Sequence, residues 1–388
     1  MITIKKRVAI LLIALFTSLP IFVYFNESKI SLSYCINRCV GIQPTTFALL
    51  LLIFLLKLRN KLFLLVFILF FSFIFEFFFY NSIEILLQPI KSIIPFFFLI
   101  GFILAKEELK NNLSFTKFLI NIFIPYCVIF FQIIIFFSET FYFLQGLHIA
   151  EPLNNIFFFN IKIYNYNQYF SFTLVLVCGI RLFLVSKKKE EFFLASMMLL
   201  SSYHALNFTS LICAILIIFF KIIFLIIPKN NQNVKILKLI SYLFALTIII
   251  FPLFSFMLIH LTSDFISMSN FDNLYSRFLR YDLIINNLKF ENLIYGSYPN
   301  SFGVGQPHSQ FLEYVLYFGI VRAAVLIFII LFMVFKISRI EYLLPLCIII
   351  GLGGGFNELF SHWYNSQIIF FYICLSSLIK INKNKMLI

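Results

Sequence analysis

Charged residues are scarce in this sequence. Asp, Glu, Lys and Arg make up 12% of its 388 residues, whereas hydrophobic residues make up 62%. This scarcity excludes a water-soluble globular domain, in which about a quarter of the residues are charged. Acidic residues are the rarer sign, with 16 Asp and Glu against 30 Lys and Arg. The composition indicates a protein that is surrounded by lipid.

The sequence also lacks the motifs of nucleotide hydrolysis, zinc chemistry and serine hydrolysis. It contains no Walker loop, no HExxH and no GxSxG, and these three chemistries therefore have no support. We expect neither a metal nor a cofactor. Cys35 and Cys39 form a CxxxC pair outside the apolar runs; a disulfide, a metal clip and no special role remain open for it.

Long apolar runs occur along the whole chain. A helix of about 20 such residues crosses a hydrocarbon core, and lipid offers no partner for free backbone amides, so these runs are expected to be helices. The predicted fold is all-α, a single polytopic membrane domain over 1–388 with about twelve transmembrane helices. The expected spans are 8–25, 43–56, 62–80, 90–105, 118–137, 169–186, 192–206, 209–227, 239–262, 318–335, 341–357 and 365–380.

Most of the 30 Lys and Arg fall in alternate loops between these spans. Loops rich in Lys and Arg stay in the cytoplasm, which predicts that both termini are cytoplasmic. The same bias accounts for the basic charge without a nucleic-acid partner. Two outer loops, 138–168 and 263–317, are long and polar enough to fold over the outer face of the bundle.

The larger outer loop contains a predicted surface helix with a pair of arginines. Its apolar residues recur at helical spacing and form one stripe, namely Leu274, Phe278, Tyr281, Ile285 and Leu288. Arg277 and Arg280 flank this stripe one turn apart, so both guanidinium groups can reach one spot beside the membrane. Anchoring to lipid headgroups and binding of a lipid-linked phosphate are the two interpretations.

His308 is the sharpest candidate for chemistry. It follows a turn-rich stretch that ends in Pro307, and Pro307 is predicted to be the first residue of a helix with His308 in its first turn. The positive end of the helix dipole favours a neutral imidazole, which can accept a proton. In this helix His308, Leu312, Val315, Gly319 and Arg322 share one face, and Gly319 permits close packing. The alternative is a His that only caps a loop-to-helix junction.

Two further residues stand between the last two spans. Glu358 and His362 are four residues apart in NELFSHWYN, so that they share one side of an outer turn. They are candidates for lining the same cavity as His308. Lys221, inside a span, is expected either to be functional or to reach an interface.

The chain resembles the superfamily of O-antigen polymerases and O-antigen ligases, bacterial membrane glycosyltransferases of the GT-C type. His308 to Gly319 matches the pattern of a His, ten residues and a Gly, and SRFLRYDL precedes it in the same loop. GVGQPHS resembles the glycine-containing approach to that His, and NYNQYF, with Asn167, resembles the Asn-rich start of the span after the first long outer loop. The chain departs from the pattern where an Arg is frequent in that loop, since it has only Lys162.

The resemblance implies a bacterial inner-membrane enzyme with a periplasmic active site. It would transfer a glycan from undecaprenyl pyrophosphate onto the non-reducing-end sugar of another lipid-linked repeat unit, without metal or nucleotide sugar. His308 would be the general base, and Arg277 and Arg280 would hold the pyrophosphate together with Asn167. A chain-length regulator and membrane lipids are further expected partners. The alternatives are an O-antigen ligase, which transfers to lipid A core, and a flippase or transporter of lipid-linked oligosaccharide.

Overall fold

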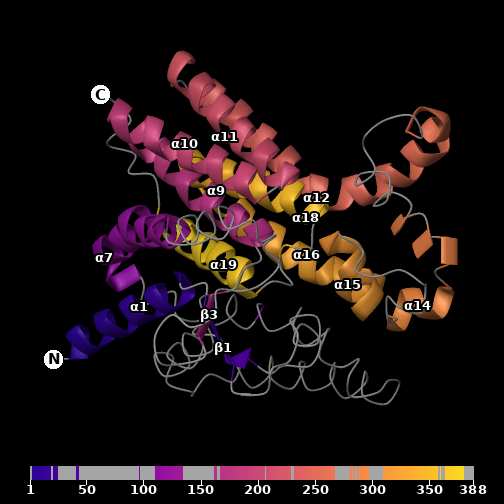
Figure 1. Cartoon of the computed structure of the whole chain (residues 1–388), viewed down its shortest axis with the longest axis horizontal. Helices are drawn as coiled ribbons and strands as arrows, with labels where there is room; N and C mark the ends of the chain where they lie inside the picture. Colours follow the sequence, from indigo (N-terminus) through magenta and orange to yellow (C-terminus); the bar gives the residue numbers. More distant parts are fainter. Residues whose placement is uncertain are drawn as a thin grey trace, which may run out of the picture.

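The computed structural model describes residues 2–18, 21–24, 41–42, 96, 110–133, 161–163, 167–205, 207–228, 231–266, 280–281, 283–284, 286–287, 289–296, 309–356, 359 and 363–379. These residues form a helical bundle with one small sheet (Figure 1). The predicted spans 43–56 and 62–80 lie outside the described residues, as does 90–105 apart from Phe96. The prediction of about twelve spans therefore stays a prediction.

The described helices follow one another with short connections. Their bounds are α1 Ile2–Ser18, α7 Leu113–Phe118 with the π-helical segment η1 Leu119–Phe123, α9 Asn167–Leu184, α10 Lys188–His204, α11 Phe208–Ile226, α12 Asn231–Ile266, α14 Phe290–Tyr295, α15 Gln310–Phe318, α16 Ile320–Phe335, α17 Ile340–Ile348 with η3 Ile349–Gly353, α18 Gly354–Phe356 and α19 Trp363–Leu378. The helix that contains α7 and η1 continues to Ile133.

Three helices in this part of the chain are long and apolar enough to cross a membrane, namely Leu113–Ile133, Phe208–Ile226 and Asn231–Pro252. They overlap the predicted spans 118–137, 209–227 and 239–262, and the second of them agrees to one residue at each end. The helical character and the membrane-spanning potential that the sequence predicts are thus confirmed for these segments. Helix α12 has 36 residues, which exceeds the about 20 that a bilayer requires, and it contains Pro252, which removes one backbone hydrogen bond.

Large apolar side chains remain exposed in stripes along these helices. On α16 the exposed residues follow a spacing of three or four, as do those on α11. They are Val321, Val325, Phe328, Phe332 and Phe335 on α16, and Ile215, Phe219, Ile222 and Ile226 on α11. Rows of this extent on separate helices indicate surfaces that face an apolar surrounding.

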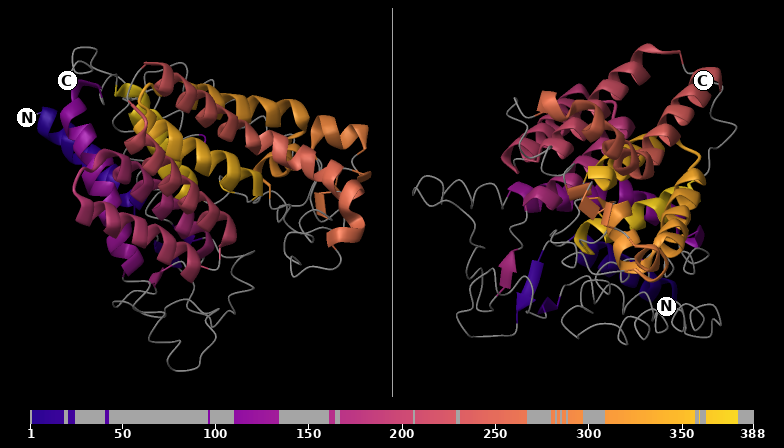
Figure 2. Two further views of the ribbon diagram at one scale, coloured as in Figure 1. Left: turned by 90° about the horizontal axis from the view of Figure 1, so that it is seen from above. Right: turned by 90° about the vertical axis from the view of Figure 1, so that its right-hand side faces the viewer.

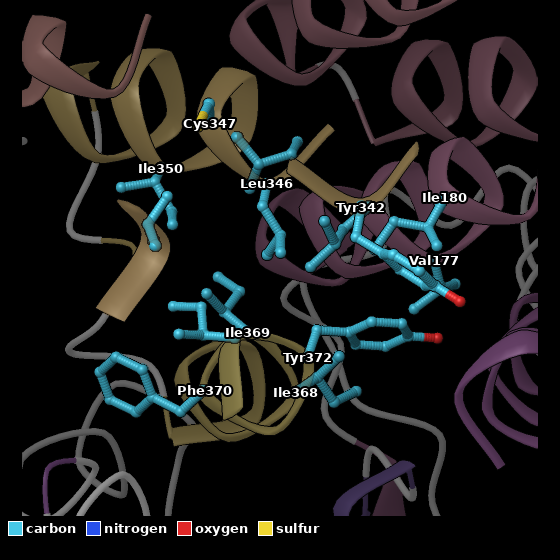
Figure 3. Close-up of a cluster of buried hydrophobic side chains, with 14 of the residues drawn as sticks. Val177, Ile180, Tyr342, Leu346, Cys347, Ile350, Ile368, Ile369, Phe370 and Tyr372 are labelled. Carbon is cyan, nitrogen blue, oxygen red and sulfur yellow. The ribbon is translucent and has the colours of Figure 1, made fainter. Parts of the chain in front are cut away.

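The core is centred where α9, α17 and α19 meet (Figure 3). Two tyrosines in it point their hydroxyls to the same side. Tyr342 of α17 donates to Asn121 Oδ1 at 2.8 Å, and Tyr372 of α19 donates to the carbonyl oxygen of Ile120 at 2.7 Å. Both acceptors lie in η1, and the two phenols therefore fasten this helix to the centre of the bundle.

Glycines permit a close crossing between α12 and η3. A β-carbon at Gly351 would overlap the carbonyl oxygen of Phe244, and one at Gly354 would lie 2.8 Å from Cδ1 of Ile248. The GLGGG sequence that spans the π-helical segment and α18 thus lets two backbones approach each other. This crossing fixes where α18 lies relative to α12.

A three-stranded antiparallel sheet adds to the helical fold (Figures 1 and 2). Its strands are β1 Ile21–Tyr24, β2 Gly41–Ile42 and β3 Ile161–Ile163, in the order β2-β1-β3. The first predicted span, 8–25, is therefore too long, because α1 ends at Ser18 and the chain turns extended three residues later. Residues 161–163 belong to the predicted outer loop 138–168, which the sheet joins to the end of α1.

Helix ends that the sequence assigns to one side of the membrane lie together. Ser171 and Ser210, near the starts of α9 and α11, are joined by their hydroxyls at 2.9 Å. At the opposite ends, Ser338 donates to the carbonyl oxygen of Ile379 at 3.3 Å. These contacts agree with the alternating helix directions that the sequence predicts. The side of the membrane to which each end belongs stays a prediction.

Candidate functional site

The structure describes three of the predicted site residues and their surroundings. Arg280 is half-buried in a helical turn, Gly319 stands between α15 and α16, and Asn167 is the first residue of α9. The others lie outside the described residues, namely Arg277, Pro307, His308, Glu358 and His362. Cys35 and Cys39 lie outside them as well.

The turn that carries Arg280 is attached to α18. Its neighbour Tyr281 is fully buried, as the predicted apolar stripe requires, and Ile284 one turn later is also fully buried. The hydroxyl of Tyr281 donates a long hydrogen bond, 3.5 Å, to the carbonyl oxygen of Gly355. Arg280 therefore stands next to a residue that fixes its backbone against α18.

Helix α15 reaches the same short element from another side. The β-carbon position of Gly354 lies 3.8 Å from Cβ of Gln310, the first residue of α15. Gly354 and Gly355 are adjacent in α18, so the segment after His308 and the segment around Arg280 contact neighbouring residues. The short helix α18 thus links the two predicted halves of the site.

The predicted helix start at Pro307 is wrong. Ser309 has an extended backbone, with φ −145° and ψ 128°, and Gln310 is the first helical residue. Pro307 and His308 therefore precede α15 and are not part of its first turn.

The single helix predicted from His308 past Gly319 is also broken. Gly319 has φ 78° and ψ 164°, which ends α15 at Phe318 and starts α16 at Ile320. A β-carbon on Gly319 would overlap the carbonyl oxygen of Ile294, and one on Gly296, whose φ is 86°, would lie 2.5 Å from the carbonyl oxygen of Tyr317. These two glycines lock the ends of α14 and α15 against each other. The prediction that Gly319 permits close packing is confirmed, but Gly319 does so at the junction between two helices and not inside one.

Sequence reasoning missed the polar residues of α15. All nine of its residues are buried, including Gln310, Glu313 and Tyr314. The Gln310 amide nitrogen donates to Oε2 of Glu313 at 2.9 Å, and only 4% of Glu313 is exposed. Burial, and then the charge of Glu313, raise the pKa of the Tyr314 phenol well above its usual value. Tyr314 thus stays a neutral hydroxyl.

A second polar cluster lies at the opposite ends of α9, α10 and α11. Lys221, 6% exposed, donates to the carbonyl oxygens of Leu182 at 2.8 Å and Val185 at 3.3 Å, and pairs with Glu191 at 2.9 Å. Its ammonium therefore caps the end of α9, where free carbonyls and the helix dipole favour a cation. Lys221 therefore has a structural contact inside the protein, which neither of its two sequence-based interpretations included.

The neighbouring pair is formed by Arg181 and Glu190, whose side chains approach to 2.7 Å. Tyr126 also donates to Glu190, at 2.7 Å. Burial alone would raise the pKa of Glu190, but the bonds from Tyr126 and Arg181 and the charges of Arg181 and Lys187 outweigh it and lower this pKa. This cluster ties helix ends together.

Within the described residues no group of three or more His, Cys, Asp or Glu is placed to hold a metal ion.

No protein-family model matches the chain, and neither a curated protein nor a solved structure matches it. The resemblance to membrane glycosyltransferases thus rests on the sequence motifs alone.

Proposed function

We propose that the protein is a membrane glycosyltransferase that polymerises repeat units carried on undecaprenyl pyrophosphate. One observation carries the proposal beyond the sequence motifs. The segments that follow His308 and surround Arg280 contact adjacent glycines of α18. Gln310, two residues after the proposed base, and Tyr281, next to the proposed cation, are thereby held against one short element.

In the proposed reaction, a hydroxyl of the acceptor sugar attacks the anomeric carbon of the donor glycan. The bond from that carbon to the pyrophosphate oxygen breaks, and undecaprenyl pyrophosphate leaves with both electrons. His308 accepts the hydroxyl proton, and Arg277 and Arg280 stabilise the negative charge that develops on the leaving group. The planar guanidinium of Arg suits a diphosphate oxygen pair better than the point charge of Lys does.

The polar, wholly buried character of α15 supports an enzyme rather than a lipid anchor for this loop. A segment that only rests on headgroups would expose its polar side chains to water. Instead, Glu313 and Gln310 are buried directly after the predicted base. Buried ionisable residues in a membrane protein are costly and are a frequent sign of a functional site.

The test uses purified protein and lipid-linked repeat units, without added metal or nucleotide. Replacing His308→Ala is expected to slow polymer formation by about a hundredfold to ten-thousandfold, the usual contribution of a general base. His204→Ala, at the end of α10, is the matched control and should retain activity. Unchanged polymer length in the His308→Ala variant would contradict the proposal. In cells that lack the protein, one repeat unit on lipid A core supports polymerisation, whereas bare core indicates a ligase.

A further inference from the structure

Helix α15 is buried on every side, yet one of its faces is polar. Residues three and four apart lie on the same face of a helix. Gln310, Glu313, Tyr314 and Tyr317 follow this spacing, and each of them is buried. Residues on the remaining faces are apolar, as in Leu312 and Val315 of the predicted face. The polar face of α15, defined by these four residues, is therefore turned into the protein interior.

Two hydroxyls at this helix have no internal partner. Neither the Tyr314 phenol nor the Ser309 hydroxyl, both fully buried, makes a hydrogen bond within the described part of the chain. A buried hydroxyl without a partner loses its hydration and gains nothing in return. Such groups in a native protein call for an explanation, and a bound molecule that supplies hydrogen bonds is a frequent one.

The charge of the polar face indicates which part of a lipid-linked glycan fits. Glu313 adds negative charge, which repels a pyrophosphate. The side chains present are a carboxylate, an amide and a phenol, which together accept and donate hydrogen bonds to neutral hydroxyls. The ring of Phe96 lies 5.9 Å from that of Tyr314 and adds an apolar wall. Neutral sugar rings combine hydroxyl edges with apolar faces and match this mixture.

We propose that the polar face of α15 is a sugar-binding subsite, in which Gln310, Glu313 and Tyr314 bind hydroxyls of the lipid-linked glycan. The inference rests on the proposed function for the identity of that glycan. Tyr281, next to Arg280, and Gln310 of α15 contact neighbouring glycines of α18, so the proposal assigns the diphosphate and the sugar to separate, oppositely charged surfaces. This arrangement orients the glycan relative to its lipid carrier.

The experiment measures binding to full-length purified protein in nanodiscs. The two probes are repeat units on undecaprenyl pyrophosphate, extracted from cells that lack the protein, and undecaprenyl pyrophosphate without glycan. Tyr314→Phe and Glu313→Gln are expected to weaken binding of the glycan-bearing lipid by about tenfold, the loss of one good hydrogen bond. Binding of the bare lipid should not change.

Stability gives an independent reading of the same variants. Tyr314→Phe removes a hydroxyl with no internal hydrogen bond, so the unfolding temperature should not fall. The matched control is Tyr342→Phe, which loses a 2.8 Å bond to Asn121 and should lower the unfolding temperature while leaving glycan binding unchanged.

The result that overturns the subsite is equal binding of the glycan-bearing lipid by wild type, Tyr314→Phe and Glu313→Gln, or no binding by wild type at all. This failure is distinct from a failure of the proposed function. Full polymerisation by the His308→Ala variant would remove the proposed mechanism, while weaker glycan binding by the α15 variants would still support the subsite.

Discussion

Replacing Gly319→Ala should be among the most destabilising single-methyl additions in the chain. The backbone at Gly319, with φ 78° and ψ 164°, lies in a region that is nearly restricted to glycine and costs another residue about 1–3 kcal/mol. The new methyl group would also overlap the carbonyl oxygen of Ile294. Backbone shifts of this kind cost a further 1–3 kcal/mol, roughly. We expect a total loss of about 4 kcal/mol in the free energy of unfolding.

The assay is equilibrium unfolding of the purified protein with increasing mole fraction of SDS. Gly179→Ala is the matched control, because Gly179 lies inside α9 and a β-carbon there would meet side chains and no backbone, namely two methyl carbons of Ile217 at 3.1 Å and Cβ of Pro345 at 3.5 Å. Alanine also favours a helix interior over glycine by about 1 kcal/mol. The control should therefore change stability little.

If the two variants lose the same free energy, the proposed locking of α14 against α15 by Gly319 is refuted. A loss confined to Gly319→Ala supports it. A Gly296→Ala variant provides a second check, because its methyl group would approach the carbonyl oxygen of Tyr317 from the other side of the same contact. The double variant should lose less free energy of unfolding than the sum of the two single losses, since both substitutions force the same two helix ends apart.

The remaining predictions concern the polar cluster at the other end of the bundle. Lys221→Met should lower the free energy of unfolding by about 3 kcal/mol, because it leaves Glu191 and a helix end without their cation. The double variant Lys221→Met with Glu191→Leu should regain most of this loss. SDS unfolding of both variants checks this, and a double variant as unstable as the single one would contradict it. Because the pKa of Glu190 is lowered in the folded protein, its carboxylate stabilises the fold at pH values above 4.5, the usual pKa of a glutamate. This contribution is lost as the pH falls through the lowered pKa. Glu190→Gln should therefore reduce the acid sensitivity of the unfolding temperature, and an unchanged pH profile would argue against the Arg181 and Tyr126 contacts.

The three candidate spans that the structure describes could be predicted because their signal is local. Span 209–227 agrees with α11, Phe208–Ile226, to one residue at each end. Helix α12 starts at Asn231, eight residues before the predicted span 239–262, because the charges of Lys235 and Lys238 indicate a loop. Long basic side chains can extend into water from a helix that continues beyond the hydrocarbon.

The buried polar face of α15 could not be predicted from periodicity. That method assumes that the apolar face is buried and the polar face exposed, and it therefore selected Leu312 and Val315. Burial of Gln310 and Glu313 depends on contacts with α12 and α18, which come from distant parts of the sequence. The break at Gly319 did have a local signal, since a glycine between two helical patterns is a common helix end.

The small sheet sets a constraint on how the protein is made. Val23 of β1 pairs with Ile161 of β3, a separation of roughly 140 residues, and a ribosome that adds about 5–20 residues per second needs on the order of ten seconds to cover it. During this interval β1 has been synthesised but β3 does not yet exist. An uncovered strand edge is prone to pair with foreign chains. Because β1 lies between β2 and β3, β2 can cover only one of its edges, and the other edge stays uncovered until residues 161–163 have been made.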